Sequence, residues 1–152
     1  MGRNSNAPRM SGRLLPRHNL TECLDSATRE LPVTMQVQPQ SITAAQALQV
    51  ALQHFQTRNL AEAERICLQV LALEPHNADA LHILGLLAHQ IGRNDIALEL
   101  IEKAIRLQPL SAEFLNSLGA VFQDLGRLGE AESCYRRALE LMPQYAEAHN
   151  NL

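Results

Sequence analysis

From residue 44 onward, apolar positions recur with the spacing of amphipathic helices. Over residues 78–90, Leu81, Leu84, Gly85 and Ala88 stand at i, i+3, i+4 and i+7, so they share one face of a helix. A second stretch, between Gly92 and Pro109, has the same kind of spacing. Its apolar face is formed by Ala97, Ile101, Ala104 and Ile105. Runs of Val, Ile and Tyr typical of strands are missing, and the pattern therefore predicts an all-α chain of paired helices.

The same pattern returns every 34 residues, which indicates an internal structural repeat. Three series of identical residues carry it: Pro75, Pro109 and Pro143; Ala63, Ala97 and Ala131; and Leu73, Leu107 and Leu141. This period divides the chain into a leader, three full repeats and the beginning of a fourth. Their bounds are 1–43, 44–77, 78–111, 112–145 and 146–152.

Local signals predict where the helices begin and end. Thr43 followed by Gln46 has the spacing of a capping box at the start of the first helix. Gly92 and Asn94 are expected to mark a turn, and Pro109 to follow the end of a helix. Small residues recur where paired helices would approach closely, and a larger side chain there would cost about 1–3 kcal/mol by overpacking. These residues are Ala63, Gly85, Ala97, Gly119 and Ala131.

The leader, residues 1–43, differs from the rest in composition. It holds four of the seven prolines and shows no sustained helical or strand period, which predicts a flexible, disordered segment. The abrupt change in composition leaves open whether translation begins at Met1 or Met35. The intact mass of the native protein would decide between them.

Charge and cysteine content narrow the function classes. The leader has five Arg against three acidic residues (+2), whereas the remainder has eight basic against thirteen acidic residues (−5). An acidic folded part argues against a nucleic-acid partner, because a surface that binds nucleic acid needs clustered Lys and Arg.

No apolar run approaches the roughly 20 residues of a membrane span. Three widely spaced cysteines, Cys23, Cys67 and Cys134, favour a reducing compartment, and we expect a cytoplasmic location.

The repeats resemble the tetratricopeptide family, whose 34-residue helical hairpins have small residues at positions 8, 20 and 27 and proline at position 32. The third repeat fits this pattern with Leu115, Leu118, Gly119, Phe122, Ala131, Tyr135, Ala138 and Pro143. In the second repeat, Ala88 and Ile101 replace the two aromatic residues. The resemblance implies a right-handed α-solenoid of antiparallel helix pairs that binds another protein or peptide.

Residues 126–152 show a narrower resemblance, to the repeats that precede the catalytic part of O-linked N-acetylglucosamine transferase-like proteins. Those repeats carry an Asn at position 6, which here is matched only by Asn151, with Gln49, Ile83 and Ser117 elsewhere. A substrate-recognition arm of a larger glycosyltransferase is therefore the alternative to a stand-alone scaffold. No catalytic residue can be carried over to this chain.

The resemblance also implies that positions 2, 5, 9, 12 and 13 of each first helix line a concave groove. The candidate partner-binding residues are Asp79, His82, His89, Gln90, Glu113, Asn116, Gln123, Asp124 and Asn150, with Leu86 and Glu147 beside them. Amides can bond the backbone of an extended peptide, and the acids favour basic neighbours. The alternative interpretation is an ordinary solvated face.

Other chemistry is not expected. Chaperone-binding tetratricopeptide domains use Lys and Asn to hold C-terminal carboxylates, but here Lys103 falls on a second helix, so we predict no such capture. His82 and His89 are two helical turns apart, about 10 Å, which is too far for one metal ion. The sequence contains no phosphate-binding, dinucleotide-binding or hydrolase motif. We therefore expect no catalytic residue, cofactor or metal.

The fourth repeat contributes only seven residues, about half of a first helix. Since a solenoid needs a polar terminal helix to cover its last apolar surface, we expect self-association or marginal stability. A monomer by light scattering with a high, concentration-independent melting temperature would contradict this expectation.

Overall fold

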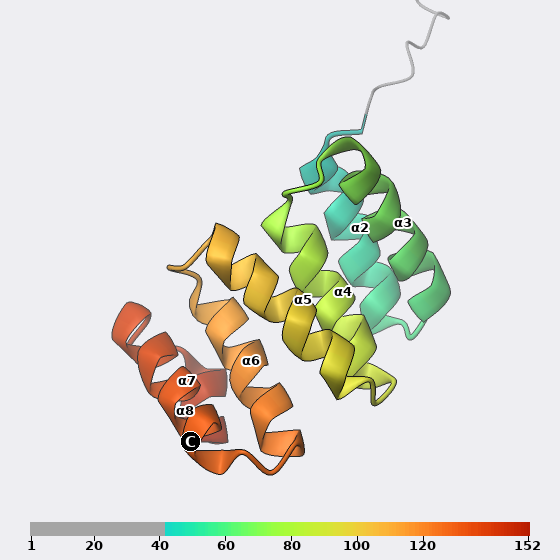
Figure 1. Cartoon of the computed structure of the whole chain (residues 1–152). Coiled ribbons are helices and arrows are strands. Elements are labelled where there is room, and N and C mark those ends of the chain that lie inside the picture. The colour runs from blue at the N-terminus through green and yellow to red at the C-terminus, as the bar shows by residue number, and fades with distance from the viewer. Residues whose placement is uncertain (1–41) are drawn as a thin grey trace, which may run out of the picture. The chain divides into compact units, whose positions relative to one another are not determined.

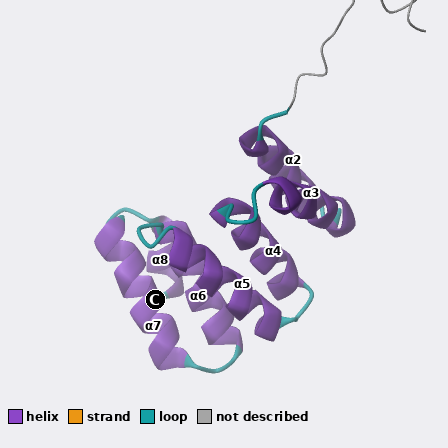
Figure 2. Ribbon diagram, turned by 45° about the horizontal axis from the view of Figure 1, so that its top comes forward, coloured by secondary structure: helices purple, strands orange, loops and turns teal. Residues whose placement is uncertain are grey.

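The computed structural model describes residues 42–152, and the predicted disordered leader, apart from its last two residues, lies outside this part. The described residues form helices and no strand, so the all-α prediction is confirmed. The helices are α2 (Ala44–Gln56), α3 (Leu60–Leu73), α4 (Ala78–Gln90), α5 (Asn94–Leu107), α6 (Ala112–Asp124), α7 (Leu128–Leu141) and α8 (Ala146–Asn151). Figure 1 shows them stacked as successive antiparallel pairs, and Figure 2 shows the short loops between them. The arrangement is an α-solenoid, as predicted.

The first helix of each pair begins with a side-chain cap. Thr43 Oγ1 accepts from the Gln46 N–H at 3.2 Å, and Gln46 Oε1 accepts from the Thr43 N–H at 3.0 Å. The predicted capping box is therefore confirmed. Asn77 and Ser111 cap α4 and α6 in the same way, each through its side-chain oxygen. These caps satisfy N–H groups that a helix leaves without intrahelical partners, and they fix the 34-residue interval between helix starts.

The turn between the two helices of each pair contains one residue with positive φ. The three residues are Arg58 (65°), Gly92 (80°) and Gly126 (74°), again 34 apart. Glycine adopts this conformation without a Cβ penalty, whereas Arg58 does so at a cost. The turn predicted at Gly92 is confirmed, but Asn94 is the first residue of α5 rather than part of the turn. The helix starts there because the left-handed Gly92 has already reversed the chain direction.

The core lies between the helices of each pair and continues between neighbouring pairs, and its small residues allow the close approach that the sequence predicted. Ala63 and Ala97 are fully buried. A Cβ on Gly85 would lie 2.5 Å from Ile101 Cγ1, and one on Gly119 would lie 2.5 Å from Tyr135 Cε1. Both distances are shorter than real Cβ contacts, so glycine is required for the present spacing of these helices.

Neighbouring pairs pack unevenly, which gives the stack two different faces. The first helices α2, α4, α6 and α8 each contact the next first helix, but α3, α5 and α7 do not approach one another within residues 42–152. The first helices therefore line the inner side of the curve, and the second helices lie spread on the outer side. We call these the inner face (α2, α4, α6, α8) and the outer face (α3, α5, α7). Within the described residues, no helix combines the length and apolar character needed to span a membrane.

Candidate partner-binding face

Basic residues are confined to one face, whereas acidic residues lie on both. The first helices carry the acidic residues Asp79, Glu113, Asp124 and Glu147, and among residues 42–152 none of them carries Lys or Arg. All basic residues of that range lie on second helices or in the turns that precede them: Arg58, Arg65, Arg93, Lys103, Arg106, Arg127, Arg136 and Arg137. At neutral pH the formal charges of the inner helices are therefore negative only.

The candidate residues differ in exposure. Five are exposed: Asp79, Glu113, Gln123, Asp124 and Asn150. His89 and Gln90 are half-buried. His82 and Asn116 are only 9% and 7% exposed, which differs from the expectation that they line an open groove. Both stand at position 5 of their helix, where the next first helix covers them, so they support the inner face rather than form its surface.

His82 is held as a neutral imidazole between α4 and α6. Its Nε2 lies 2.8 Å from Ser117 Oγ, and its ring centroid lies 4.4 Å from that of Phe114. Ser117 Oγ donates its own proton to the Glu113 carbonyl at 3.0 Å, so the hydrogen-bond pattern assigns the imidazole proton to Nε2. Burial lowers the pKa of His82 to about 4, because the charged form would lose its hydration. The residue therefore has a packing role.

Polar pairs link successive first helices along the inner face. Three of them share an offset of 35 residues: His82–Ser117, His89–Asp124 and Asn116–Asn151. His89 Nε2 lies 2.7 Å from Asp124 Oδ2, and Asn151 Nδ2 donates to Asn116 Oδ1 at 3.1 Å. Because the offset exceeds the 34-residue period by one, the second residue of each pair stands one position later in its repeat than the first residue does in the preceding repeat. Sequence comparison at a shift of 34 missed Ser117 and Asn151 as partners, whereas a shift of 35 would have paired them.

The first junction, between α2 and α4, is built differently. Leu48 and Ile83, which stand at the same offset, are both buried and apolar and belong to one core cluster. The residue 35 positions before Gln90 is Phe55, which has no polar group in its side chain. The buried Oε1 of Gln90 has no hydrogen-bond donor within the described residues. Polar pairing therefore begins at α4, where the acidic residues also begin.

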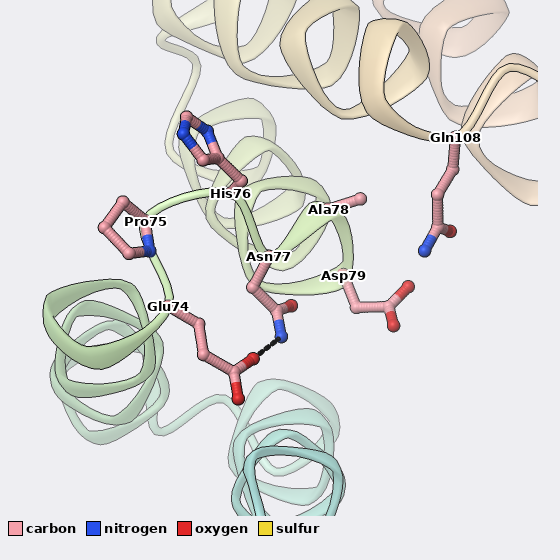
Figure 3. Close-up of a pocket in the computed structure, with 7 residues that line it drawn as sticks. All are labelled: Glu74, Pro75, His76, Asn77, Ala78, Asp79 and Gln108. Atoms are coloured by element: carbon pink, nitrogen blue, oxygen red, sulfur yellow. Dashed lines mark hydrogen bonds between the residues drawn. The ribbon is translucent and has the colours of Figure 1, made fainter.

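Asp79 borders a shallow pocket of about 380 Å³ at the corner between α3, α4 and α5. Figure 3 shows the carboxylates of Glu74 and Asp79 on the same side of this corner, with Gln108 beyond Asp79. Asn77 Nδ2 donates to Glu74 Oε2 at 2.7 Å, which orients that carboxylate. Asp79 accepts no side-chain hydrogen bond from residues 42–152, so its carboxylate is available to a partner.

The two described cysteines are not activated as nucleophiles, and the described residues form no metal-ligating group. Burial raises the pKa of the Cys67 thiol to about 11, and burial also raises that of the half-buried Cys134. Such thiols are protonated and weakly nucleophilic at neutral pH. Cys23 lies outside the described residues. Within residues 42–152, no three His, Cys, Asp or Glu side chains gather in a way that would hold a metal ion.

The sequence profile of the tetratricopeptide repeat family matches residues 48–112 and 90–148. No curated protein matches the sequence. Among solved structures, a mutant of the Thermobaculum terrenum O-GlcNAc transferase is 33% identical, with a TM-score of 0.70 over 72% of this chain. This chain covers only 21% of that transferase.

Two smaller proteins are also similar in structure. The first TPR of Spaghetti (RPAP3), bound to the HSP90 peptide SRMEEVD, is 22% identical, with a TM-score of 0.67 over 76% of this chain and 92% of its own. The Yersinia enterocolitica type III secretion translocator chaperone SycD is 21% identical, with a TM-score of 0.63 over 74% and 86%. At these identities the similarity concerns the fold alone.

Proposed function

Because the chain belongs to the tetratricopeptide repeat family, we propose that it is a protein-interaction module whose inner face binds an extended partner segment carrying Lys or Arg. This proposal rests on the charge of the inner face: the first helices of residues 42–152 carry four carboxylates and no Lys or Arg. Opposite charge across an interface raises the association rate and excludes partners of the same charge. The chain has no catalytic role in this proposal.

Asp79 and Glu113 are the principal contacts in this proposal. Both are exposed, both occupy position 2 of a first helix, and neither carboxylate accepts a hydrogen bond from residues 42–152. Asn150 offers an exposed amide, which can both donate to and accept from the backbone of an extended chain. His82, Asn116 and their partners contribute by holding the first helices in register.

A peptide-display selection on the intact chain tests the proposal. We expect enriched peptides to contain Lys or Arg and to lose affinity as salt is raised, because screening weakens exposed charge pairs. The double change Asp79→Lys with Glu113→Lys should weaken them by about tenfold, which corresponds to about 1.4 kcal/mol. Glu99→Lys with Glu140→Lys is the matched control, since both residues are exposed on the outer face, on α5 and α7. Equal loss in the control, or enrichment of acidic peptides, would refute the proposal.

A second candidate rests on the 33% identity with the O-GlcNAc transferase of Thermobaculum terrenum. We propose, as the alternative, that these repeats form the substrate-recognition arm of a larger glycosyltransferase. The genomic sequence that follows the codon for Leu152 distinguishes the two. Further repeats followed by several hundred residues with an α/β pattern would favour the transferase arm, and a stop after one capping helix would favour the adaptor.

A further inference from the structure

An apolar groove of about 530 Å³ lies between α3 and α5, with α4 as its floor. Leu60, Leu68, Leu84 and Ile91 are among its lining residues. Leu68 and Ile91 are 53% and 64% exposed, so much aliphatic surface faces water. Because the backbones of α3 and α5 do not come close to one another, the groove opens on the outer side, opposite the inner face.

The groove exists because the second repeat lacks an aromatic residue. Ala88 lies on its floor, and the equivalent residue one repeat later is Phe122. Phe122 is buried, and the guanidinium carbon of Arg127 lies 4.6 Å from its ring centroid. Arg93 stands at the position equivalent to Arg127 but has no ring beneath it. The third repeat thus fills with its own side chains the space that the second repeat leaves open.

The apolar lining is not required by the fold. Leu68 and Ile96 line the groove, and the residues 34 positions later are Glu102 and Glu130. The same backbone therefore accepts charged residues at both places. An exposed aliphatic patch that packing does not demand is typical of a binding surface.

We propose that this groove binds one amphipathic helix of a partner protein, independently of the inner face. The lining residues of α3 run from Leu60 to Leu68, about 12 Å, or two turns of a helix. An aliphatic ridge at i, i+4 and i+7 matches such a groove. A second copy of this chain fits poorly, because in a symmetric dimer the groove of one copy would face the same groove of the other and leave a void between them.

Charge selects the orientation of the docked helix. Glu64 lies on the α3 wall and Arg93 on the α5 side, and both line the groove. Arg93 has only a 3.6 Å contact with Asp95, and its side chain is 57% exposed. The docked helix therefore carries a basic flank toward α3 and an acidic flank toward α5.

The test uses two helical peptides of about 16 residues, long enough for a stapled helix. Both have leucines at i, i+4, i+7 and i+11; the first has Lys along one flank and Glu along the other, and the second has Lys along both flanks. Fluorescence anisotropy measures their binding to the intact chain. We expect the first peptide to bind about fivefold more tightly than the second, because in either direction only the first can pair with both Glu64 and Arg93. Arg93→Glu should reverse this preference, because both charged residues of the groove would then be acidic.

Groove variants and a matched control localise the binding. Leu68→Glu and Ala88→Phe should each weaken it by about tenfold or more, and each mimics a residue that the fold carries 34 positions later. Leu128→Glu makes the same change as Leu68→Glu at a 64% exposed position outside the groove, and should leave binding unchanged. Circular dichroism confirms that the variants fold. No binding of either peptide, no reversal of preference, or equal loss in Leu128→Glu would overturn the proposal. A dimer in light scattering that Ala88→Phe dissolves would also overturn it, with a second copy as the occupant.

Discussion

Replacing Gly119 with alanine adds one methyl group where α6 meets the ring of Tyr135. The new Cβ would lie 2.5, 2.8 and 2.9 Å from three ring carbons. The ring cannot move away easily, because Tyr135 is 2% exposed and its hydroxyl donates to Gln123 Oε1 at 2.9 Å. The helices α6 and α7 must therefore separate, or the ring must leave its preferred rotamer.

Two opposing effects set the magnitude. Overpacking of a dense core costs about 1–3 kcal/mol, while glycine to alanine inside a helix gains up to about 1 kcal/mol. Three close contacts with a rigid ring put the overpacking cost near the upper end, so we expect a net loss of about 1–2 kcal/mol. Gly85→Ala should cost a similar amount, because the new Cβ would lie 2.5 Å from Cγ1 of Ile101, a fully buried β-branched side chain that is stiff at χ1 in a helix.

Urea unfolding followed by circular dichroism measures these differences as changes in the free energy of unfolding. Gly129→Ala is the matched control, because Gly129 lies in the first turn of α7 and a Cβ there would meet nothing within 4 Å. It should stabilise the protein by a few tenths of a kcal/mol. A Gly119→Ala variant as stable as the wild type would refute the packing argument, as would equal effects at positions 119 and 129.

Further predictions concern a turn, a buried histidine, a thiol and a peptide. Arg58→Gly should raise the free energy of unfolding by about 1 kcal/mol in urea titrations, because it removes a left-handed non-glycine residue. Burial lowers the pKa of His82 from 6.5 to about 4, so between these values the unfolded chain binds more protons, and stability decreases as the pH is lowered. Urea midpoints at pH 7 and 4.5 should differ less in His82→Asn than in the wild type. Cys67 should react with a thiol reagent at pH 8 only after unfolding, because burial raises its pKa to about 11. Calorimetric titration with SRMEEVD, the peptide bound in the similar RPAP3 structure, should show no binding, and micromolar affinity would contradict the charge argument.

Local signals in the sequence were enough to predict the helix pairs. Capping at Thr43, the turn at Gly92 and the close approach at Gly85 each depend on residues near in the chain or on the repeat itself. The first helices of residues 42–152 begin 34 residues apart: side chains cap α2, α4 and α6, and a proline precedes α4, α6 and α8 at the same distance.

The burial of individual candidate residues was not predictable in the same way. His82 and Asn116 fall beneath the surface because neighbouring first helices are offset by one position, which a period of 34 does not reveal. The left-handed turn at Arg58 lacks a glycine signal and becomes visible only by alignment with Gly92 and Gly126. The outer groove depends on the missing ring at Ala88, a substitution that the sequence shows but whose consequence requires the packing of three helices.

NMR titration of the isotopically labelled chain with a display-selected peptide tests whether the inner face binds the partner. We expect chemical-shift changes to follow α4 and α6, to be largest near Asp79 and Glu113, and to leave the exposed residues of α5 and α7 unchanged. Changes concentrated on α3, α5 and α7, with the first helices unaffected, would contradict it.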